Sequence, residues 1–174
     1  FQRQLGLSRY ETAFQILHKL RAGMVRQGRD RIGGNLGRDD HVEVDETYIG
    51  GVAHGGKGGR SLETKTLVVG AVEVRSRTFG GRRAERLRLR VIPDASGREL
   101  VGFIRDHVAP GTVVLTDGWK GYNGLRAAGY DHRPVVEGDP SNAPRILPVI
   151  HREFSNLWTW LLGTHHGRVE RRHL

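Results

Sequence analysis

The 174-residue sequence contains no cysteine and only one methionine. Without cysteine the chain has no disulfide bridge, no thiolate zinc site and no cysteine nucleophile. It also lacks any apolar run near the roughly 18–20 residues of a membrane-spanning helix, and its first residues do not follow the pattern of a secretory signal peptide. These absences predict a cytoplasmic protein that makes no contact with a membrane.

Acidic residues are also in the minority, with 19 Asp and Glu against 28 Lys and Arg and a formal net charge of +9. An excess of positive charge favours a polyanionic partner, most often nucleic acid. The chain is 37% hydrophobic and 27% charged, which is typical of a globular protein rather than a disordered one. Its length suits one domain with a proper core and a short appendage.

Hydrophobic periodicity separates a helical N-terminal segment from a larger domain. Within residues 1–27, Ser8 and Glu11 have the spacing of a capping box, and apolar residues then recur at steps of three and four. Glycines interrupt this pattern from residue 28 to residue 40, so this stretch is expected to be a linker. The domain itself is expected at residues 41–174. Because the chain begins with Phe1 and stops within a charged stretch, we expect a fragment truncated at both ends, with an incomplete C-terminus.

From residue 41 apolar and polar residues alternate, which is the period of a β-strand. Three strand-like stretches come first, the second of which is a continuous apolar run, and a helix, a strand, a helix, a strand and a helix follow. The expected ranges are 41–50, 66–74, 86–92, 97–108, 113–116, 123–129, 133–136 and 151–162. A three-stranded antiparallel meander that leads into alternating helices and strands predicts an α/β fold. The order is that of a ribonuclease-H-like mixed sheet with flanking helices, preceded here by the helical segment.

Two aspartates occupy unusual places in this pattern. Asp45 interrupts a strand-like stretch, and Asp117 directly follows the strand-like run 113–116. Aspartate is depleted in strands, and a carboxylate buried beside a sheet is costly unless it is paired or binds a cation. Each residue alone could simply cap a turn. Two of them in a basic protein favour a site for one or two Mg²⁺ ions, which can bridge carboxylates and nucleic-acid phosphate.

A third oxygen ligand is expected from the last helix. Glu153 and Asn156 are three residues apart and therefore share one face of that helix. The spacing leaves the choice between them open, and Asn156 could equally be an ordinary surface residue.

Several motifs along the chain occur together in one known family. They are Val42-Glu43-Val44-Asp45-Glu46-Thr47-Tyr48-Ile49-Gly50-Gly51, Thr116-Asp117-Gly118-Trp119 with Tyr122, His151 with Ser155-Asn156-Leu157, and Trp160-Leu161-Leu162-Gly163-Thr164-His165-His166-Gly167. In this order they resemble a bacterial insertion-sequence transposase of the DDE superfamily, in its ISXO-type group, some of whose members carry Asn as the third catalytic residue. The resemblance implies catalytic and metal-binding roles for Asp45, Asp117 and Asn156, and it favours Asn156 over Glu153.

The resemblance implies metal-dependent cleavage and strand transfer of DNA during transposition of an insertion sequence. The expected cofactor is Mg²⁺ or Mn²⁺, with two ions, and the expected roles are that Asp45 bridges both ions, Asp117 holds one and Asn156 binds through its amide oxygen. The residues expected to support these ligands are Glu46, His151 and Glu153. The implied partners are the insertion-sequence ends and target DNA in the nucleoid, bound by a homo-oligomer.

Basic residues are expected to contact DNA at three places. The glycine-rich stretch 54–60 contains Lys57 and Arg60 but lacks the ending of a P-loop, so it is either a hairpin tip that touches phosphate or a solvated loop. Arg86, Arg88 and Arg90 would form one cationic face of a strand, whose DNA binding falls with salt. Lys120, shortly after Asp117, completes the set.

The sequence departs from the family pattern after Asn156, where many relatives have Lys or Arg in place of Trp158. The upstream zinc ribbon and the helical tail of relatives are also missing. Residues 1–27 resemble the second half of a helix-turn-helix, whose second helix would lie in the major groove, although a bridging helix is an equal alternative. These departures leave a second function open, that of a catalytically inactive transposase remnant that only binds DNA through its basic surface.

Overall fold

The computed structural model describes residues 2–24, 28–50, 65–135 and 146–165. The chain divides into two compact units, Phe1–Asp30 and Arg31–Leu174. The first unit consists of turns followed by one helix, α1 (Tyr10–Met24), which falls within the segment expected to be helical. No helix in the described part of the chain combines the length and the apolar character needed to cross a bilayer.

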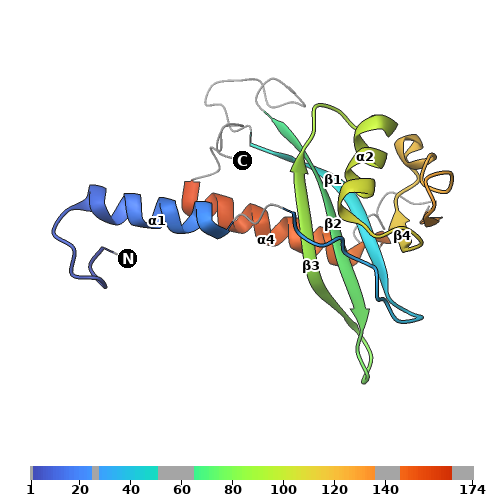
Figure 1. Cartoon of the computed structure of the whole chain (residues 1–174), viewed down its shortest axis with the longest axis horizontal. Coiled ribbons are helices and arrows are strands. Elements are labelled where there is room, and N and C mark those ends of the chain that lie inside the picture. Colours follow the sequence, from blue (N-terminus) through green and yellow to red (C-terminus); the bar gives the residue numbers. More distant parts are fainter. Residues whose placement is uncertain (1, 25–27, 51–64, 136–145, 166–174) are drawn as a thin grey trace. The chain divides into compact units, whose positions relative to one another are not determined.

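The second unit contains a five-stranded mixed sheet with the strand order β3-β2-β1-β4-β5 (Figure 1). Strands β1 (His41–Ile49), β2 (Thr66–Ser76) and β3 (Arg82–Val91) form the predicted antiparallel meander. Strand β4 (Val113–Thr116) pairs in parallel with β1, and β5 (Asp131–Pro134) pairs in parallel with β4. This arrangement confirms the ribonuclease-H-like α/β fold that the element order predicted.

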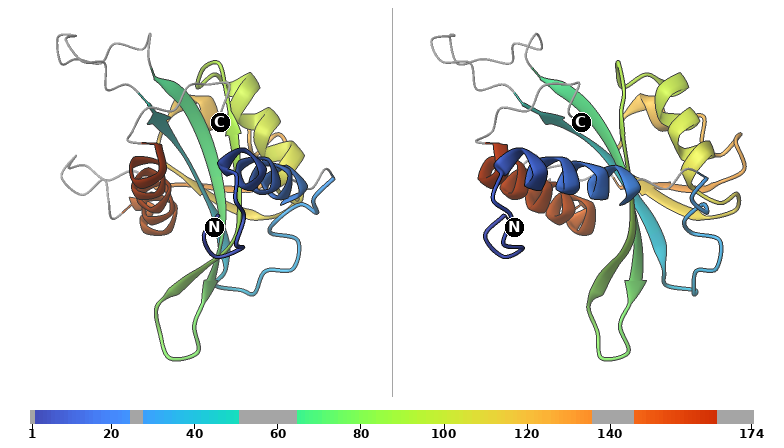
Figure 2. Two further views of the ribbon diagram at one scale, coloured as in Figure 1. Left: turned by 90° about the vertical axis from the view of Figure 1, so that its left-hand side faces the viewer. Right: turned by 60° about the vertical axis from the view of Figure 1, so that its left-hand side comes forward.

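Helices α2 (Gly97–His107) and α4 (Pro148–His165) cover opposite faces of the sheet (Figure 2). The alternation along β1 sends Val42 and Val44 into the core beneath α2, where they meet Phe103. On the other face, the core formed by α4 contains Phe154 and residues of β2. Strand β1 therefore lies between two packed layers, and its polar side chains on the α4 side are held inside the protein.

Gly70 on β2 shows why α4 can approach the sheet closely. A Cβ atom at this position would lie 2.7 Å from Cε1 of Phe154 and 3.1 Å from Cδ1 of Ile150, so any side chain here would force α4 outwards. Gly70 is also the direct pairing partner of Asp45 on β1. Directly opposed residues of an antiparallel pair share a face, and Asp45 therefore lies on the α4 side.

Several local predictions differ from the structure; β3 begins at Arg82 and β5 at Asp131, four and two residues before their expected starts. Residues 123–129 were expected to be helical, but they form turns, and the 3-10 helix η2 (Lys120–Tyr122) comes directly before them. The close packing of Gly121, where a Cβ atom would lie 2.8 Å from the Ala95 carbonyl oxygen, favours this tight irregular path over a regular helix. Helix α4 begins at Pro148, three residues before the expected start, because proline suits the first turn of a helix.

The stretch expected to be a linker also contributes to the core. Ile32 is fully buried and forms a parallel β-bridge with Val108. The Ile32 amide donates to the His107 carbonyl and the Ile32 carbonyl accepts from the Ala109 amide, each at 2.8 Å. Residues 31–40 thus belong to the larger unit, while the domain boundaries expected from the sequence stay a prediction.

Candidate active site

Asp45 lies in the middle of the central strand β1, and Asp117 directly follows β4, the parallel strand beside it. The register pairs Val42 with Val114 and Glu43 with Leu115, and the same register continued by two residues places Asp117 beside Asp45. Adjacent strands are about 4.8 Å apart. Two aspartates that are distant in the sequence are therefore neighbours in the fold.

The Asp45 carboxylate joins β1 to α4. Its Oδ2 atom lies 2.7 Å from Nε2 of His151, in the first turn of α4, and its Oδ1 atom accepts a hydrogen bond of 2.8 Å from the main-chain amide of Glu46. Both side chains of the Asp45–His151 pair are partly exposed. The carboxylate is thus held in one orientation while it still faces solvent.

The Asp117 carboxylate is oriented by the turn that follows β4. Its Oδ1 atom accepts a hydrogen bond of 3.0 Å from the main-chain amide of Trp119. Partial burial raises the pKa of Asp117, and the nearby charge of Asp45 adds to this rise, while the Trp119 amide and His151 oppose it. The two aspartates and His151 therefore lie close enough for their charges to interact.

A third carboxylate lies beside this pair, on the other face of β1. The Tyr122 hydroxyl donates a hydrogen bond of 2.5 Å to Oε2 of Glu46. The pKa of Glu46 is raised to about 7, chiefly by burial and in addition by the charges of Asp45 and Asp117, while the Tyr122 hydrogen bond opposes the rise. Such a concentration of like charge favours the binding of a cation.

Sequence reasoning missed the role of Glu43, which is fully buried on the α4 side of β1. Its Oε2 atom accepts hydrogen bonds from the main-chain amides of Val149 (2.9 Å) and Ile150 (2.8 Å). These amides belong to the first turn of α4 and have no partner within the helix. Glu43 therefore caps α4 from the neighbouring strand and fixes the turn that carries His151. The available signal was an acidic residue at a core-facing position of a strand.

The side chain of Asn156 bonds to Glu153, and the predicted role of Asn156 as the third ligand stays a prediction. Asn156 is exposed, and its side-chain amide donates a hydrogen bond of 3.4 Å to Oε2 of Glu153. In the described part of the chain no hydrogen bond or ion pair joins Asn156 to Asp45 or Asp117. At 3.6 residues per turn, the five positions between His151 and Asn156 place these side chains about 140° apart around α4. The residues that do come together are Asp45, Glu46, Asp117 and His151.

The three arginines of β3 that were expected to contact DNA make contacts within the protein. Arg86 binds Oε2 of the buried Glu73, with nitrogen–oxygen distances of 2.9 Å and 2.8 Å. Arg90 lies 2.7 Å from Asp106 and over the Phe103 ring. The third arginine, Arg88, donates to the Leu87 carbonyl.

The residues predicted to contact DNA do not all lie on the same side of the sheet as Asp45. Arg88 pairs with Ala71 and Arg90 with Val69, so these arginines lie on the α2 side of the sheet, opposite to Asp45. Lys120, by contrast, is exposed three residues after Asp117. Lys57 and Arg60 lie outside the described residues.

A divalent cation needs donor side chains that lie close together. Within the described residues, no group of three or more His, Asp or Glu side chains is arranged to hold a metal ion. Mg²⁺, however, is commonly bound by one or two carboxylates, with water and substrate phosphate in the remaining positions. Asp45 and Asp117 supply the oxygen donors that such a site requires.

Comparison with known proteins gave one match. No curated protein and no solved structure matched the chain. A family model described as an ISXO2-like transposase domain matches residues 37–174, which include both aspartates and α4.

Proposed function

The chain belongs to the family of ISXO2-like transposase domains, and we propose that it catalyses metal-dependent cleavage and strand transfer of DNA during transposition of an insertion sequence. Membership of this family supports transposition as the process and DNA as the partner. The observation that carries the catalytic proposal is the parallel register that places Asp117 beside Asp45. We further propose that the ends of the element and the target DNA are bound by a homo-oligomer.

Asp45 and Asp117 would hold Mg²⁺ or Mn²⁺, one or two ions, between them. When bound, the metal supplies charge neutralisation and polarisation of a phosphodiester. The protein itself orients the donors, since His151 holds one oxygen of Asp45 and the Trp119 amide holds one oxygen of Asp117. These contacts fix the orientation of both carboxylates in the protein without DNA.

The third ligand in the proposal is Asn156, and its support is the family resemblance. A neutral amide binds a cation only through its carbonyl oxygen, more weakly than a carboxylate does. Glu153 is the competing candidate, because it lies within hydrogen-bond distance of Asn156 on the same helix. Separate Asn156→Ala and Glu153→Ala variants would show which side chain the reaction requires.

Nicking of supercoiled plasmid DNA by the purified chain, in Mg²⁺ and in Mn²⁺, tests the proposal. Asp45→Asn and Asp117→Asn keep the shape of the side chains but remove their charge, and the nicking rate should fall about 100-fold or more. Asp131→Asn is the matched control, because Asp131 is an exposed aspartate of β5 that pairs with Arg133. Its rate should equal that of the parent chain.

Two results would contradict the proposal. Equal nicking in the parent chain and in both aspartate variants would remove Asp45 and Asp117 from the site. Salt-sensitive DNA binding without nicking in either metal would establish the alternative function, an inactive remnant that binds DNA.

A further inference from the structure

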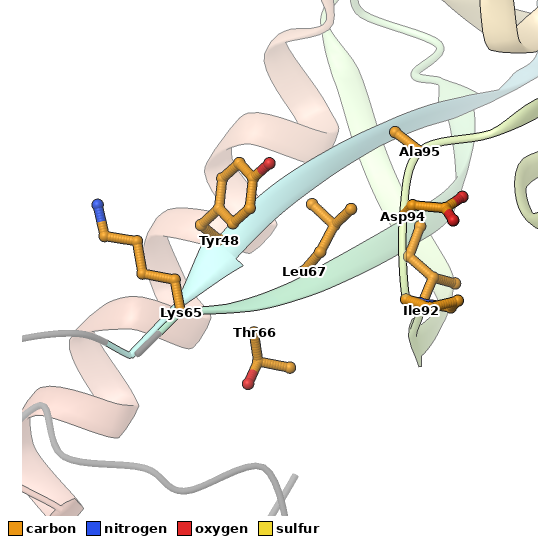
Figure 3. A pocket seen from close by; sticks show the side chains of 8 residues that line it. Tyr48, Lys65, Thr66, Leu67, Ile92, Asp94 and Ala95 are labelled. Carbon is orange, nitrogen blue, oxygen red and sulfur yellow. The ribbon is translucent and has the colours of Figure 1, made fainter. Parts of the chain in front are cut away.

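A hollow of about 250 Å³ lies at the end of β1, on the α2 side of the sheet, whereas Asp45 lies on the α4 side (Figure 3). Figure 3 shows Tyr48 and Lys65 on one side, Ile92 and Ala95 on the other, and Leu67 between them. Tyr48 and Leu67 are direct pairing partners of β1 and β2, so the tyrosine ring stands beside the apolar leucine. The volume lies below the roughly 300 Å³ at which typical small-molecule pockets begin. The hollow therefore suits a single flat ring.

Tyr48 leaves much of its ring open to a ligand. The side chain is 45% exposed although it lies on a strand whose other residues are largely covered. Figure 3 also shows the Asp94 carboxylate directed away from Tyr48, and its Oδ1 atom accepts a hydrogen bond of 2.9 Å from the Ser96 amide. The cationic side chain at the rim of the hollow is Lys65, which suits a phosphate outside it.

Trp119 connects the hollow to the aspartates. Its indole Nε1–H donates a hydrogen bond of 2.8 Å to the Ala95 carbonyl, and its main-chain amide donates to Asp117. The ring is nevertheless 51% exposed. The absence of a side chain at Gly121 permits this arrangement, because a Cβ atom there would lie 2.8 Å from Trp119 Nε1. Trp119 is therefore an open aromatic surface in a fixed position.

Exposed aromatic rings beside a cation are the usual means by which proteins hold unpaired bases. We propose that the hollow binds an unpaired base of the DNA substrate. The base stacks on Tyr48 above Leu67, Trp119 supports the adjoining nucleotide, and Lys65 contacts a phosphate. This inference rests on the proposed function, since it names the form of DNA that the site takes.

The test measures the affinity for a labelled single-stranded oligonucleotide by fluorescence anisotropy, in EDTA and at several salt concentrations. Tyr48→Ser should weaken binding about tenfold at every salt concentration, because it removes a stacking surface and no charge. Tyr48→Phe keeps the ring and should bind within about twofold of the parent chain. Lys65→Gln should reduce the slope of log affinity against log salt by about one unit.

Phe79→Ser serves as the matched control, because Phe79 is a fully exposed aromatic residue between β2 and β3. Its affinity should be unchanged. Equal affinity in Tyr48→Ser and the parent chain, or an equal loss in Tyr48→Phe, would overturn the proposal. Urea unfolding of each variant excludes a loss caused by misfolding.

The measurement is independent of catalysis, since EDTA removes divalent ions and Asp45 and Asp117 remain unchanged. A chain that fails to nick plasmid DNA but shows the ring-dependent affinity would lose the proposed catalytic function and keep the base site. A chain that nicks DNA but shows no ring dependence would keep the catalytic function and lose the base site.

Discussion

Oδ2 of Asp45 lies 2.7 Å from Nε2 of His151, and this contact links the central strand of the sheet to the first turn of α4. It joins Asp45 to a residue of α4 that lies 106 positions later in the sequence. The orientation of Asp45 therefore depends on how α4 is seated. The following predictions test that dependence and other contacts of the fold.

Replacement of His151 should impair the site without removing an aspartate. In His151→Ala the Asp45 carboxylate loses the partner that orients it, and we expect metal-dependent nicking to fall about 10- to 100-fold, as is typical when a residue that supports a metal ligand is removed. His151→Gln, which can still donate from its amide, should recover part of the rate. Nicking of plasmid DNA measures both variants, and unchanged nicking in His151→Ala would contradict this role.

Replacement of Glu43 should lower stability through helix α4. Glu43→Ala leaves two buried amides of Val149 and Ile150 without an acceptor, and we expect a loss of about 3 kcal/mol in the free energy of unfolding. Glu43→Gln keeps an acceptor oxygen and should lose less, about 1 kcal/mol. Urea denaturation provides the measurement. Glu85→Ala, at an exposed position of β3, should change stability by no more than about 0.5 kcal/mol.

Arg86 is expected to act on stability more than on DNA binding. Glu73 is buried, and its two carboxylate oxygens form ion pairs, one with Arg75 and the other with Arg86. Arg86→Ala removes one of these cations and should lower the free energy of unfolding by about 1–3 kcal/mol. Arg83→Ala, at an exposed position of the same strand, is the control and should change it by less than about 0.5 kcal/mol. A stable Arg86→Ala variant with about tenfold weaker DNA binding would instead support the DNA contact expected from the sequence.

His132 should make stability depend on pH. Burial lowers the pKa of His132, and the nearby Arg126 lowers it further, while its Nε2 atom lies 2.9 Å from the Thr116 hydroxyl. As pH falls through about 6.5, the unfolded chain binds the proton first, so the free energy of unfolding decreases. Urea denaturation at pH 7.5 and pH 5.5 should show a smaller decrease in His132→Gln than in the parent chain. His18→Gln, an exposed position of α1, should keep the full decrease.

Much of the fold could be predicted from local patterns. The alternation of residues 41–50 identified β1, because the side-chain period of a strand is two residues, and the apolar run 66–74 identified β2. The helix expected at 97–108 is present as α2, and the Ser96 side chain accepts the Glu99 amide at its start. The prediction failed at residues 123–129, where packing of Gly121 against Ala95 favours turns. No local sequence pattern predicts that contact.

The sequence by itself determined the strands, the helices and the motifs that carry the family, because each of these depends on residues close together in the chain. Only the tertiary structure decided which side chains meet. The register of β1 with β4 places Asp117 beside Asp45, and Glu43 reaches the start of α4 across 106 residues. Asn156 shows the same dependence, because the seating of α4 on Gly70 and Glu43 determines the direction of each of its faces. Such contacts arise from strand pairing and helix packing, and chain spacing does not encode them.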